Sequence, residues 1–590
     1  DIAVAISVSV MLSLLVAVTL IPALANGLLG GVKTEKGGMR IPGLDNFARG
    51  FTNFWTGYAR FVTRNKKMAV TLVALIVVVA GSISILIMPK LDYLPKGNRN
   101  LVFGIVMPPA GYNLDTNEGI ARNVADATKK HWSRGAYKEI NKPEDQKIDR
   151  FFYVARLGRM FMAATHIDPQ KAGELEAIIE GPARAEPGVF AFMFQPSLFG
   201  RSIGSGRAID IEISGPDLAT IYDVGRQVFF ATRTLLPPNQ GNRVRPKPAL
   251  TLGEPEVRIT PDRVRLSDNG LSARELGESV DAFNDGIRVA EVTVDGKRID
   301  LTLKGPDPVQ ESTQAIRSLP VVTSDGRIVP VGNLADVRET TGPTEIQRLD
   351  RSRAMTVSVS PRDGMPLEEA AELLETKILA PLRAKGLPEG VRFRLGGSAD
   401  KLKETWNHMQ LDLLLALVIV FLVMAVLFES FLYPWVVMLT VPVAAAGGLG
   451  GLALLNTYVP QSLDMLTMLG FVILIGIVVN NAILLVHQTL FHIREDGMDV
   501  NTAIETATRN RIRPIFMSTL TSVFGMMPLV AFPGAGSELY RGLGAVVLGG
   551  LSLSAVLTMA IVPPMMSITV GIIERRKARK AGGAEPVAAE

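Results

Sequence analysis

The run LDMLTMLGFVILIGIVVNNAILLV, residues 463–486, decides the fold class of this chain. It is long enough to cross a bilayer, because a helix of about 20 mainly apolar residues spans the hydrocarbon core. Near its end the run contains the polar pair Asn480 and Asn481. Polar side chains inside a bilayer are costly, and they either bond neighbouring helices or carry out a function. The run therefore predicts a membrane helix with a polar site.

Six further stretches share this apolar character, and all seven lie towards the two ends of the chain. The stretches are residues 2–24, 68–88, 411–432, 435–455, 463–486, 514–532 and 543–572. Hydrophobic residues make up 47% of the 590 residues, yet charged residues still reach 20% and concentrate in the middle. The predicted fold class is an α-helical membrane bundle of seven spans with a large α+β insert outside the membrane. The spans occupy segments 1–25, 68–88 and 409–572.

Composition and motifs exclude several classes of function. The net charge is only +5, and no basic and aromatic stripe occurs, so we expect no nucleic-acid partner. The absence of cysteine excludes disulfides and thiolate metal sites. No P-loop and no H-E-x-x-H motif is present, so we expect neither an enzyme nor a cofactor. Met160, Met162 and Met193 are soft enough to bind Cu(I), but thioethers are more often plain core, and no metal site is expected.

The distribution of Lys and Arg predicts the orientation of the spans. Basic residues cluster between the first two spans, after the fifth, and in the tail at 573–590. The connections 456–462 and 533–541 hold at most one basic residue. Because short cytoplasmic connections are rich in Lys and Arg, the N-terminus and the insert are expected outside and the C-terminus inside.

Residues 44–65 alternate aromatic residues with arginine at helical spacing. The aromatic residues that can share one face are Phe47, Phe51, Phe54, Trp55, Tyr58 and Phe61. This pattern predicts an amphipathic helix in the cytoplasmic interface of the membrane, with an ordinary packed helix as the alternative.

The insert alternates strand and helix patterns. One α+β unit is predicted at 97–200, and a second at 205–258 is completed by 350–400, with a strand at 256–259 in the second unit. Split βαβ units of this kind are typical of a ferredoxin-like fold. The piece between them, 259–349, carries Asp295-Gly296 between two alternating runs, which predicts a hairpin in a small separate domain.

Five segments, in this order and spacing, resemble the C-terminal half of a resistance-nodulation-division (RND) efflux permease of the hydrophobe/amphiphile type. The segments are SVSVMLSLLVAVTLIP at 7–22, LFESF at 427–431, GIVVNNAI at 476–483, RIRPIFMSTL at 511–520 and IVPPM at 561–565. The resemblance covers essentially the whole chain. It implies a protein of twelve spans, of which these are the sixth to the twelfth, so the chain is expected to be an N-terminally truncated fragment.

The resemblance also implies a function. Members of this family export amphiphilic compounds by proton antiport, through conformational cycling of a trimer in the bacterial inner membrane. They work with a periplasmic adaptor protein and an outer-membrane channel. The two α+β units then correspond to porter subdomains, and 259–349 to a docking subdomain. The expected partners are two further copies of the chain, adaptor, channel, amphiphilic substrate and membrane lipid.

Finally, the resemblance implies a proton-coupling site, with an aspartate pair on a span upstream of this chain. A family lysine falls at Asn480, an arginine at Arg511 and a hydroxyl at Ser518. Asparagine cannot supply the positive charge that pairs with an aspartate. With their polar neighbours, the candidate proton-relay residues are Asn480, Asn481, Arg511, Arg513, Ser518 and Thr519.

Two alternative functions remain open at the level of sequence. One is a relative in the same superfamily that moves lipids or assists secretion. The other is a membrane scaffold or sensor with an external ligand-binding domain, which the lack of an intramembrane carboxylate would suit.

Overall fold

The protein is described here from a computed structural model. It describes residues 2–29, 44–95, 97–109, 112–156, 158–196, 198, 207–248, 250, 253–284, 286–305, 313–342, 345–362, 364–532, 534 and 536–581. Residue 1, the basic residues at 33, 36 and 40, the predicted boundary near 200–205 and the end of the tail, 582–590, lie outside the described residues.

Seven helices in the described part are long and apolar enough to cross a membrane. They are α1 (Ile2–Leu29), α3 (Lys66–Ile87), α14 (Ser398–Leu427), α15 (Tyr433–Met438) continued by α16 (Thr440–Asn456), α17 (Met465–Arg494), α18 (Val500–Ala531) and α19 (Arg541–Ala581), which follows the short η6 (Ser537–Tyr540). Each overlaps one predicted stretch. Helices α14 and α18 begin well before 411 and 514, because hydropathy marks only the apolar part of a helix that continues with polar residues.

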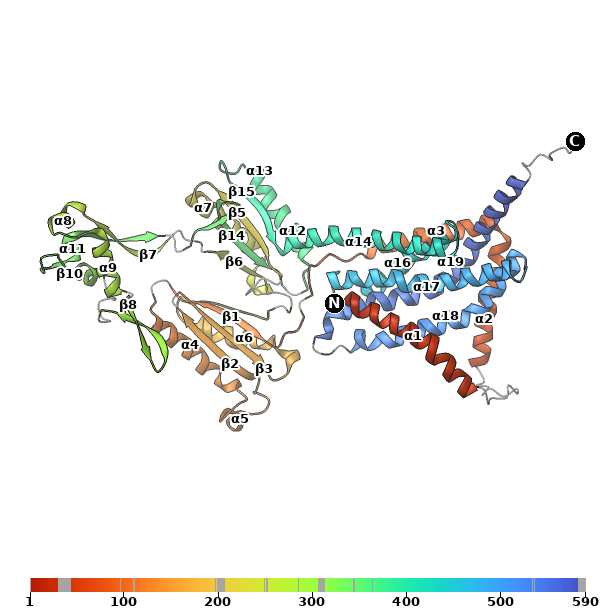
Figure 1. The fold of residues 1–590 in the computed structure, drawn as a ribbon, viewed down its shortest axis with the longest axis horizontal. Helices are drawn as coiled ribbons and strands as arrows, with labels where there is room; N and C mark the ends of the chain where they lie inside the picture. The colour runs from red at the N-terminus through yellow and green to blue at the C-terminus, as the bar shows by residue number, and fades with distance from the viewer. Residues whose placement is uncertain are drawn as a thin grey trace.

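Helix α19 lies at the centre of the bundle, against α16, α17 and α18. Small residues allow the closest approach: a Cβ on Gly451 would lie 2.5 Å from the carbonyl oxygen of Ala545. A Cβ on Gly549 would lie 2.4 Å from that of Gly447. Glycines at such a crossing bring two membrane helices into backbone contact, so these positions accept no larger residue. Helix α1 begins at the end of the bundle facing the insert, and α19 ends at the opposite end (Figure 1).

Helix α2 (Leu44–Arg64) forms where the aromatic pattern predicts it. Its aromatic face is divided lengthwise. Trp55 is buried, the ring of Phe51 packs edge-on against Phe516 at 4.9 Å, and the Tyr58 hydroxyl donates to the carbonyl oxygen of Ala560 at 2.7 Å. The remaining aromatic residues, Phe47, Phe54 and Phe61, are exposed. One edge of the helix therefore packs on the bundle, and the other is free to contact a lipid interface.

The first α+β unit is a four-stranded antiparallel sheet in the order β2-β3-β1-β4. Its elements are β1 (Val102–Met107), α4 (Leu114–Thr128), η1 (Lys129–His131), α5 (Tyr137–Ile140), β2 (Ile148–Arg156), β3 (Arg159–His166), η2 (Pro169–Lys171), α6 (Glu174–Ala185) and β4 (Phe190–Phe194). Strand β3 was not predicted, because its burial does not alternate cleanly between neighbouring residues. Met160, Met162 and Met193 are fully buried in this core.

The second unit is a five-stranded sheet in the order β13-β14-β5-β15, with β6 also paired to β14. Its elements are β5 (Ile209–Gly215), α7 (Leu218–Leu235), η3 (Pro238–Gln240), β6 (Arg243–Lys247), β13 (Gln347–Leu349), β14 (Ser352–Ser360), α12 (Leu367–Leu374), η5 (Glu375–Leu379), α13 (Ala380–Ala384) and β15 (Arg392–Gly397). The prediction of a strand of this sheet at 256–259 is wrong. The strand exists, but it pairs elsewhere, since alternation predicts a strand and not its partner.

The inserted piece lies farthest from the bundle (Figure 1). Strands β7 (Glu254–Pro261) and β12 (Ala335–Gly342) form its paired arms. Between them lie α8 (Arg263–Asp268), α9 (Ala273–Asn284), β8 (Ile287–Val294), β9 (Lys297–Leu303), α10 (Thr313–Arg317), β10 (Pro320–Val322), β11 (Ile328–Pro330) and α11 (Val331–Leu334). The predicted hairpin is confirmed: β8 pairs with β9, and Asp295 and Gly296 have φ of 50° and 76°, as a type I′ turn requires.

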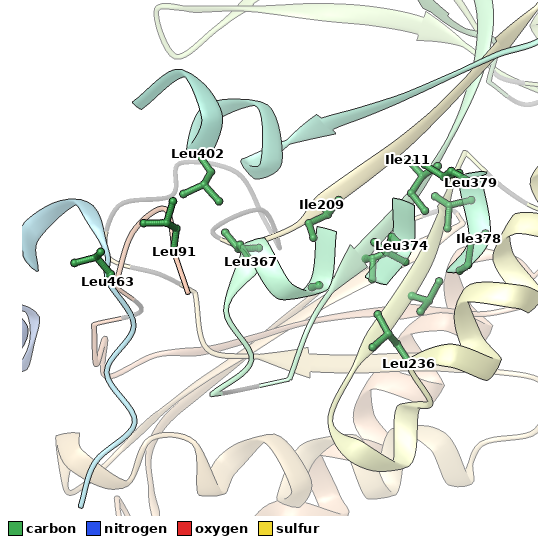
Figure 2. Packing of buried hydrophobic residues seen from close by; sticks show 14 of the residues in the cluster. Leu91, Ile209, Ile211, Leu236, Leu367, Leu374, Ile378, Leu379, Leu402 and Leu463 are labelled. Carbon is green, nitrogen blue, oxygen red and sulfur yellow. The ribbon is translucent and has the colours of Figure 1, made fainter. Parts of the chain in front are cut away.

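The core of the second unit is continuous with that of the bundle (Figure 2). Leu91, just after α3, lies beside Leu463, just before α17, and the two form an isolated parallel bridge. Leu402 of α14 and Leu367 of α12 complete the contact on the side of the second unit. The second unit therefore packs directly onto the helices of the bundle. The first unit has its own core, and a cavity lies between it and the second unit.

Candidate functional site

Two of the candidate coupling residues meet between α17 and α18. Asn481 is buried, with 6% of its surface exposed, and its amide nitrogen donates to the hydroxyl of Thr519 at 3.5 Å. Helix α17 is started by Asp464, whose carboxylate accepts from the backbone nitrogen of Thr467 at 2.8 Å. Helix α18 is started by Asp499, which accepts from the backbone nitrogen of Asn501 at 3.2 Å. The hydrogen bond between Asn481 and Thr519 joins the two capped helices.

The other candidates are not brought together in the described part of the chain. Asn480 is exposed and has no hydrogen-bond partner among the described residues. The Ser518 hydroxyl donates to the carbonyl oxygen of Ile515 at 3.0 Å, within its own helix. Arg513 is exposed. A helix period places neighbours on different faces, so Asn480 cannot face α18 where Asn481 does.

Arg511 is half-buried and belongs to a row of polar side chains. Its Nη2 donates to Oε1 of Gln488 at 2.6 Å, while its buried Nε has no partner among the described residues. Nε2 of Gln488 lies 3.1 Å from Nε2 of His492, and Nδ1 of His492 lies 2.6 Å from Oδ2 of Asp496. Sequence reasoning missed Gln488, His492 and Asp496, although Gln488 and His492 lie four residues apart on one face of α17, and Asp496 follows four residues later, just after the helix ends.

A buried ion pair fastens the second unit to the bundle. Nη2 of Arg207, just before β5, lies 2.6 Å from Oδ2 of Asp92, and the two side chains are only 11% and 7% exposed. Arg207 also donates to the carbonyl oxygen of Met365 at 2.7 Å. The backbone nitrogen of Asp92 donates to the carbonyl oxygen of Leu463 at 3.1 Å. Sequence reasoning missed this pair, because its members are 115 residues apart.

A cavity of about 710 Å³ lies between the two α+β units. Residues of α6 and β4 form one wall, and residues of α7, β6 and β14 form the other. Its lining combines phenylalanine rings with arginines: Phe190, Phe192, Phe194, Phe229, Arg184, Arg207, Arg233, Arg243, Arg245 and Arg362. Arg243 of β6 crosses between the units, with its Nη2 2.6 Å from Oε2 of Glu176 of α6. The size and the mixture of aromatic and polar groups suit a small amphiphilic ligand.

Comparison with known proteins agrees with this architecture. Residues 1–569 match the model of the AcrB/AcrD/AcrF family. The multidrug resistance protein MdtC of Erwinia amylovora is 29% identical over 308 residues, which cover 52% of this chain and 29% of that protein. MdtC of Salmonella agona is 33% identical over 308 residues, again 52% and 29% of the two chains. An uncharacterized transporter of Haemophilus influenzae is 26% identical over 320 residues, 54% of this chain and 30% of that one.

A solved structure shows the same fold. The crystal structure of a heavy metal efflux pump superposes with a TM-score of 0.70 at 20% identity, covering 88% of this chain and 51% of that chain. This chain thus spans about half of the pump, and its aligned part spans less than a third of the curated relatives. With a family match over nearly its whole length, the chain belongs to the AcrB/AcrD/AcrF family of RND permeases.

Proposed function

We propose that this chain is part of an inner-membrane efflux transporter that exports amphiphilic compounds by proton antiport. The observation that carries the proposal is the cavity between the two α+β units. One of its walls belongs to the second unit, whose core is continuous with the bundle. A shift of the membrane helices would therefore move one wall against the other and change the cavity. The MdtC relatives, named multidrug resistance proteins, support export as the activity.

We further propose that the chain is the C-terminal part of a longer protein, with its helices as the sixth to the twelfth of twelve spans. Coverage of about half of the matched pump supports this. The exposure of apolar helices supports it too. In the described chain, none of the most apolar part of α1 is buried, and only 11% of the corresponding part of α14 and of α18 is buried. Further spans would cover these surfaces. In this assignment 97–200 and 205–258 with 350–400 are the porter subdomains, and 259–349, extended to include all of β7, is the docking subdomain.

For proton coupling we propose Arg511 as the positive charge that responds to carboxylates on the missing spans. Asn480, in the position of the family lysine, is neutral. Arg511 is half-buried and, among the half-buried Lys and Arg residues that the structure describes, lies nearest in sequence to Asn480 and Asn481. Gln488 holds the guanidinium at 2.6 Å. Asn481 and Thr519 hold α17 and α18 together, while Asn480, Arg513 and Ser518 point to surfaces that the missing spans would cover.

A trimer is proposed from the hairpin of β8 and β9. All of its β9 residues and nearly all of its β8 residues are exposed, and one face is apolar. The exposed apolar residues are Val289, Val292, Val294, Ile299, Leu301 and Leu303. An isolated two-stranded hairpin is at best marginally stable in water, so an apolar face like this one needs a surface to pack against. A neighbouring copy is the proposed surface, and a periplasmic adaptor and an outer-membrane channel are the proposed partners of the same end.

Substituting Ile299→Glu together with Leu301→Glu is expected to dissociate the trimer. Loss of a central apolar contact at an interface costs about 2 kcal/mol or more, and each 1.4 kcal/mol changes an association constant about tenfold. Light scattering of the complete protein in detergent would measure the mass. The matched control, Thr293→Glu with Thr302→Glu, puts the same charges on the opposite hairpin face and should remain trimeric. Equal masses for both double variants would exclude the hairpin from the interface.

The transport proposal is tested with the complete protein in liposomes carrying an imposed pH gradient. Proton antiport predicts that movement of an amphiphilic dye, either the anion fluorescein or the cation rhodamine 6G, across the membrane accelerates several-fold with the gradient. The rate should return to the protein-free rate when a protonophore collapses the gradient. The same rate with and without the gradient would contradict proton antiport.

A further inference from the structure

The charged side chains that line the cavity are mostly positive. Six arginines line the cavity, and the one lining carboxylate among the described residues is Glu176. That carboxylate is already engaged, because Oε2 pairs with Arg243 and Oε1 accepts from the backbone nitrogen of Gln195 at 2.9 Å. A ligand in this cavity therefore meets an excess of positive charge.

Three of the arginines have structural partners, so they do not define the ligand. Arg184 pairs with Glu180, Arg207 with Asp92 and Arg243 with Glu176. These ion pairs tie α6, the segment after α3 and β6 into the cavity walls. Arg233 of α7 is exposed and forms no ion pair with a described carboxylate.

Arg245 of β6 is the guanidinium best placed to bind a ligand. It lies over the ring of Phe192, 5.3 Å from the ring centroid, and it is half-buried. No carboxylate among the described residues forms an ion pair with it. Asp210, whose charge raises the pKa of Arg245, itself lies 3.6 Å from Nζ of Lys247 and accepts from the Ser358 hydroxyl at 2.5 Å. Burial lowers the pKa of Arg245 below its ordinary value. Asp210 offsets part of the free-energy cost of desolvating this guanidinium, and an anion in direct contact with the guanidinium would offset more of it.

We propose that the cavity selects anionic amphiphiles, in which a carboxylate or sulfonate binds Arg245 and an aromatic body stacks beside Phe192. This inference rests on the proposed function and names its substrate class. A guanidinium presents paired N–H donors that match the two oxygens of such an anion. The phenylalanine rings of β4 supply the apolar surface for the rest of the molecule. A cationic amphiphile of the same shape meets repulsion instead, so the arginines reject as well as attract.

The test compares two xanthene dyes that share a ring system and differ in charge: fluorescein, an anion, and rhodamine 6G, a cation. Binding to the complete protein in zwitterionic nanodiscs is measured by fluorescence polarisation, with empty nanodiscs as the blank. Wild-type protein should bind fluorescein more tightly. Arg245→Gln should weaken fluorescein binding about tenfold, the scale of one lost hydrogen-bonded charge, and leave rhodamine 6G binding unchanged or tighter.

The matched control is Arg226→Gln, which removes the same charge from an exposed α7 residue paired with Asp223 and absent from the cavity lining. It should bind both dyes as wild type does. If Arg245→Gln fails to give a single peak in size-exclusion chromatography, Arg233→Gln takes its place, with a loss of fluorescein affinity still expected. Unchanged fluorescein affinity in a folded cavity variant, or tighter binding of rhodamine 6G by wild type, overturns the anion inference. Neither result touches gradient-driven transport, which the liposome assay decides separately.

Discussion

Arg511→Ala in the complete protein is expected to reduce gradient-driven export at least about tenfold while leaving the abundance and the assembled mass of the protein unchanged. The expected size follows from a lost coupling free energy of about 1–3 kcal/mol between proton binding and export. Arg511 is the arginine whose Nη2 reaches across from α18 to Gln488 of α17. Without it, the two helices lose the positive charge proposed to respond to protonation of carboxylates elsewhere in the bundle. Dye export from liposomes under an imposed pH gradient would measure the loss.

Arg509→Ala is the matched control, because Arg509 lies two residues earlier on the same helix and is exposed. It should export at the wild-type rate. Gln488→Ala separates position from charge: the guanidinium remains but loses its hydrogen-bond partner, so an intermediate rate is expected. Wild-type export by Arg511→Ala would remove Arg511 from the coupling site. Loss of abundance alone would point to folding, which is why membrane levels and trimer mass are measured alongside.

Asp92→Ala is expected to weaken the attachment of the second unit to the bundle by about 3–5 kcal/mol, the usual cost of leaving one member of a buried ion pair without its partner. Arg207 would then keep its charge at 11% exposure, with the carbonyl oxygen of Met365 as its remaining hydrogen-bond acceptor among the described residues. The readout is thermal unfolding of the purified protein in detergent, followed by protease cleavage between α3 and β1. The variant should melt earlier and be cut faster than wild type.

Two further variants test the cause of this effect. Lys90→Ala removes the exposed Lys90–Glu372 pair two residues away, at 3.0 Å, and should change neither melting nor cleavage noticeably. Asp92→Leu combined with Arg207→Met removes both charges, and much of the stability should return, since two apolar side chains avoid the desolvation cost. A melting temperature for Asp92→Ala equal to that of Lys90→Ala would show that the pair does not hold the unit in place.

Much of the fold was predictable because the relevant signals are local. Each of the seven described helices that are long and apolar enough to cross a membrane carries its own apolar run, so the sequence indicated each of them. The Asp295-Gly296 turn encodes its hairpin through backbone angles that few other residue pairs adopt. The pairing of one strand was predicted wrongly: β7 was recognised as a strand but assigned to the wrong sheet. A second strand, β3, was overlooked because its burial does not alternate cleanly between neighbouring residues.

The candidate site divides in the same way. The sequence pointed to Asn480 and Asn481, since polar residues stand out in an apolar run, and the family resemblance pointed to Arg511. It did not separate the buried Asn481, bonded to Thr519, from the exposed Asn480 beside it. The row through Gln488 and His492 was visible as a four-residue spacing, but the sequence analysis considered histidine only as part of the H-E-x-x-H metal-binding motif.

By itself, the sequence determined that this is a membrane protein with a large α+β insert, because hydropathy and turn chemistry act over a few neighbouring residues. It also contains every arginine of the cavity lining, without indicating that these arginines line one cavity. Only the tertiary structure decided that Arg245 stacks on Phe192, that Arg207 reaches Asp92, and that one unit shares its core with the bundle. Those contacts join residues tens to hundreds of positions apart, and their energies depend on burial and distance, which the packed chain alone defines.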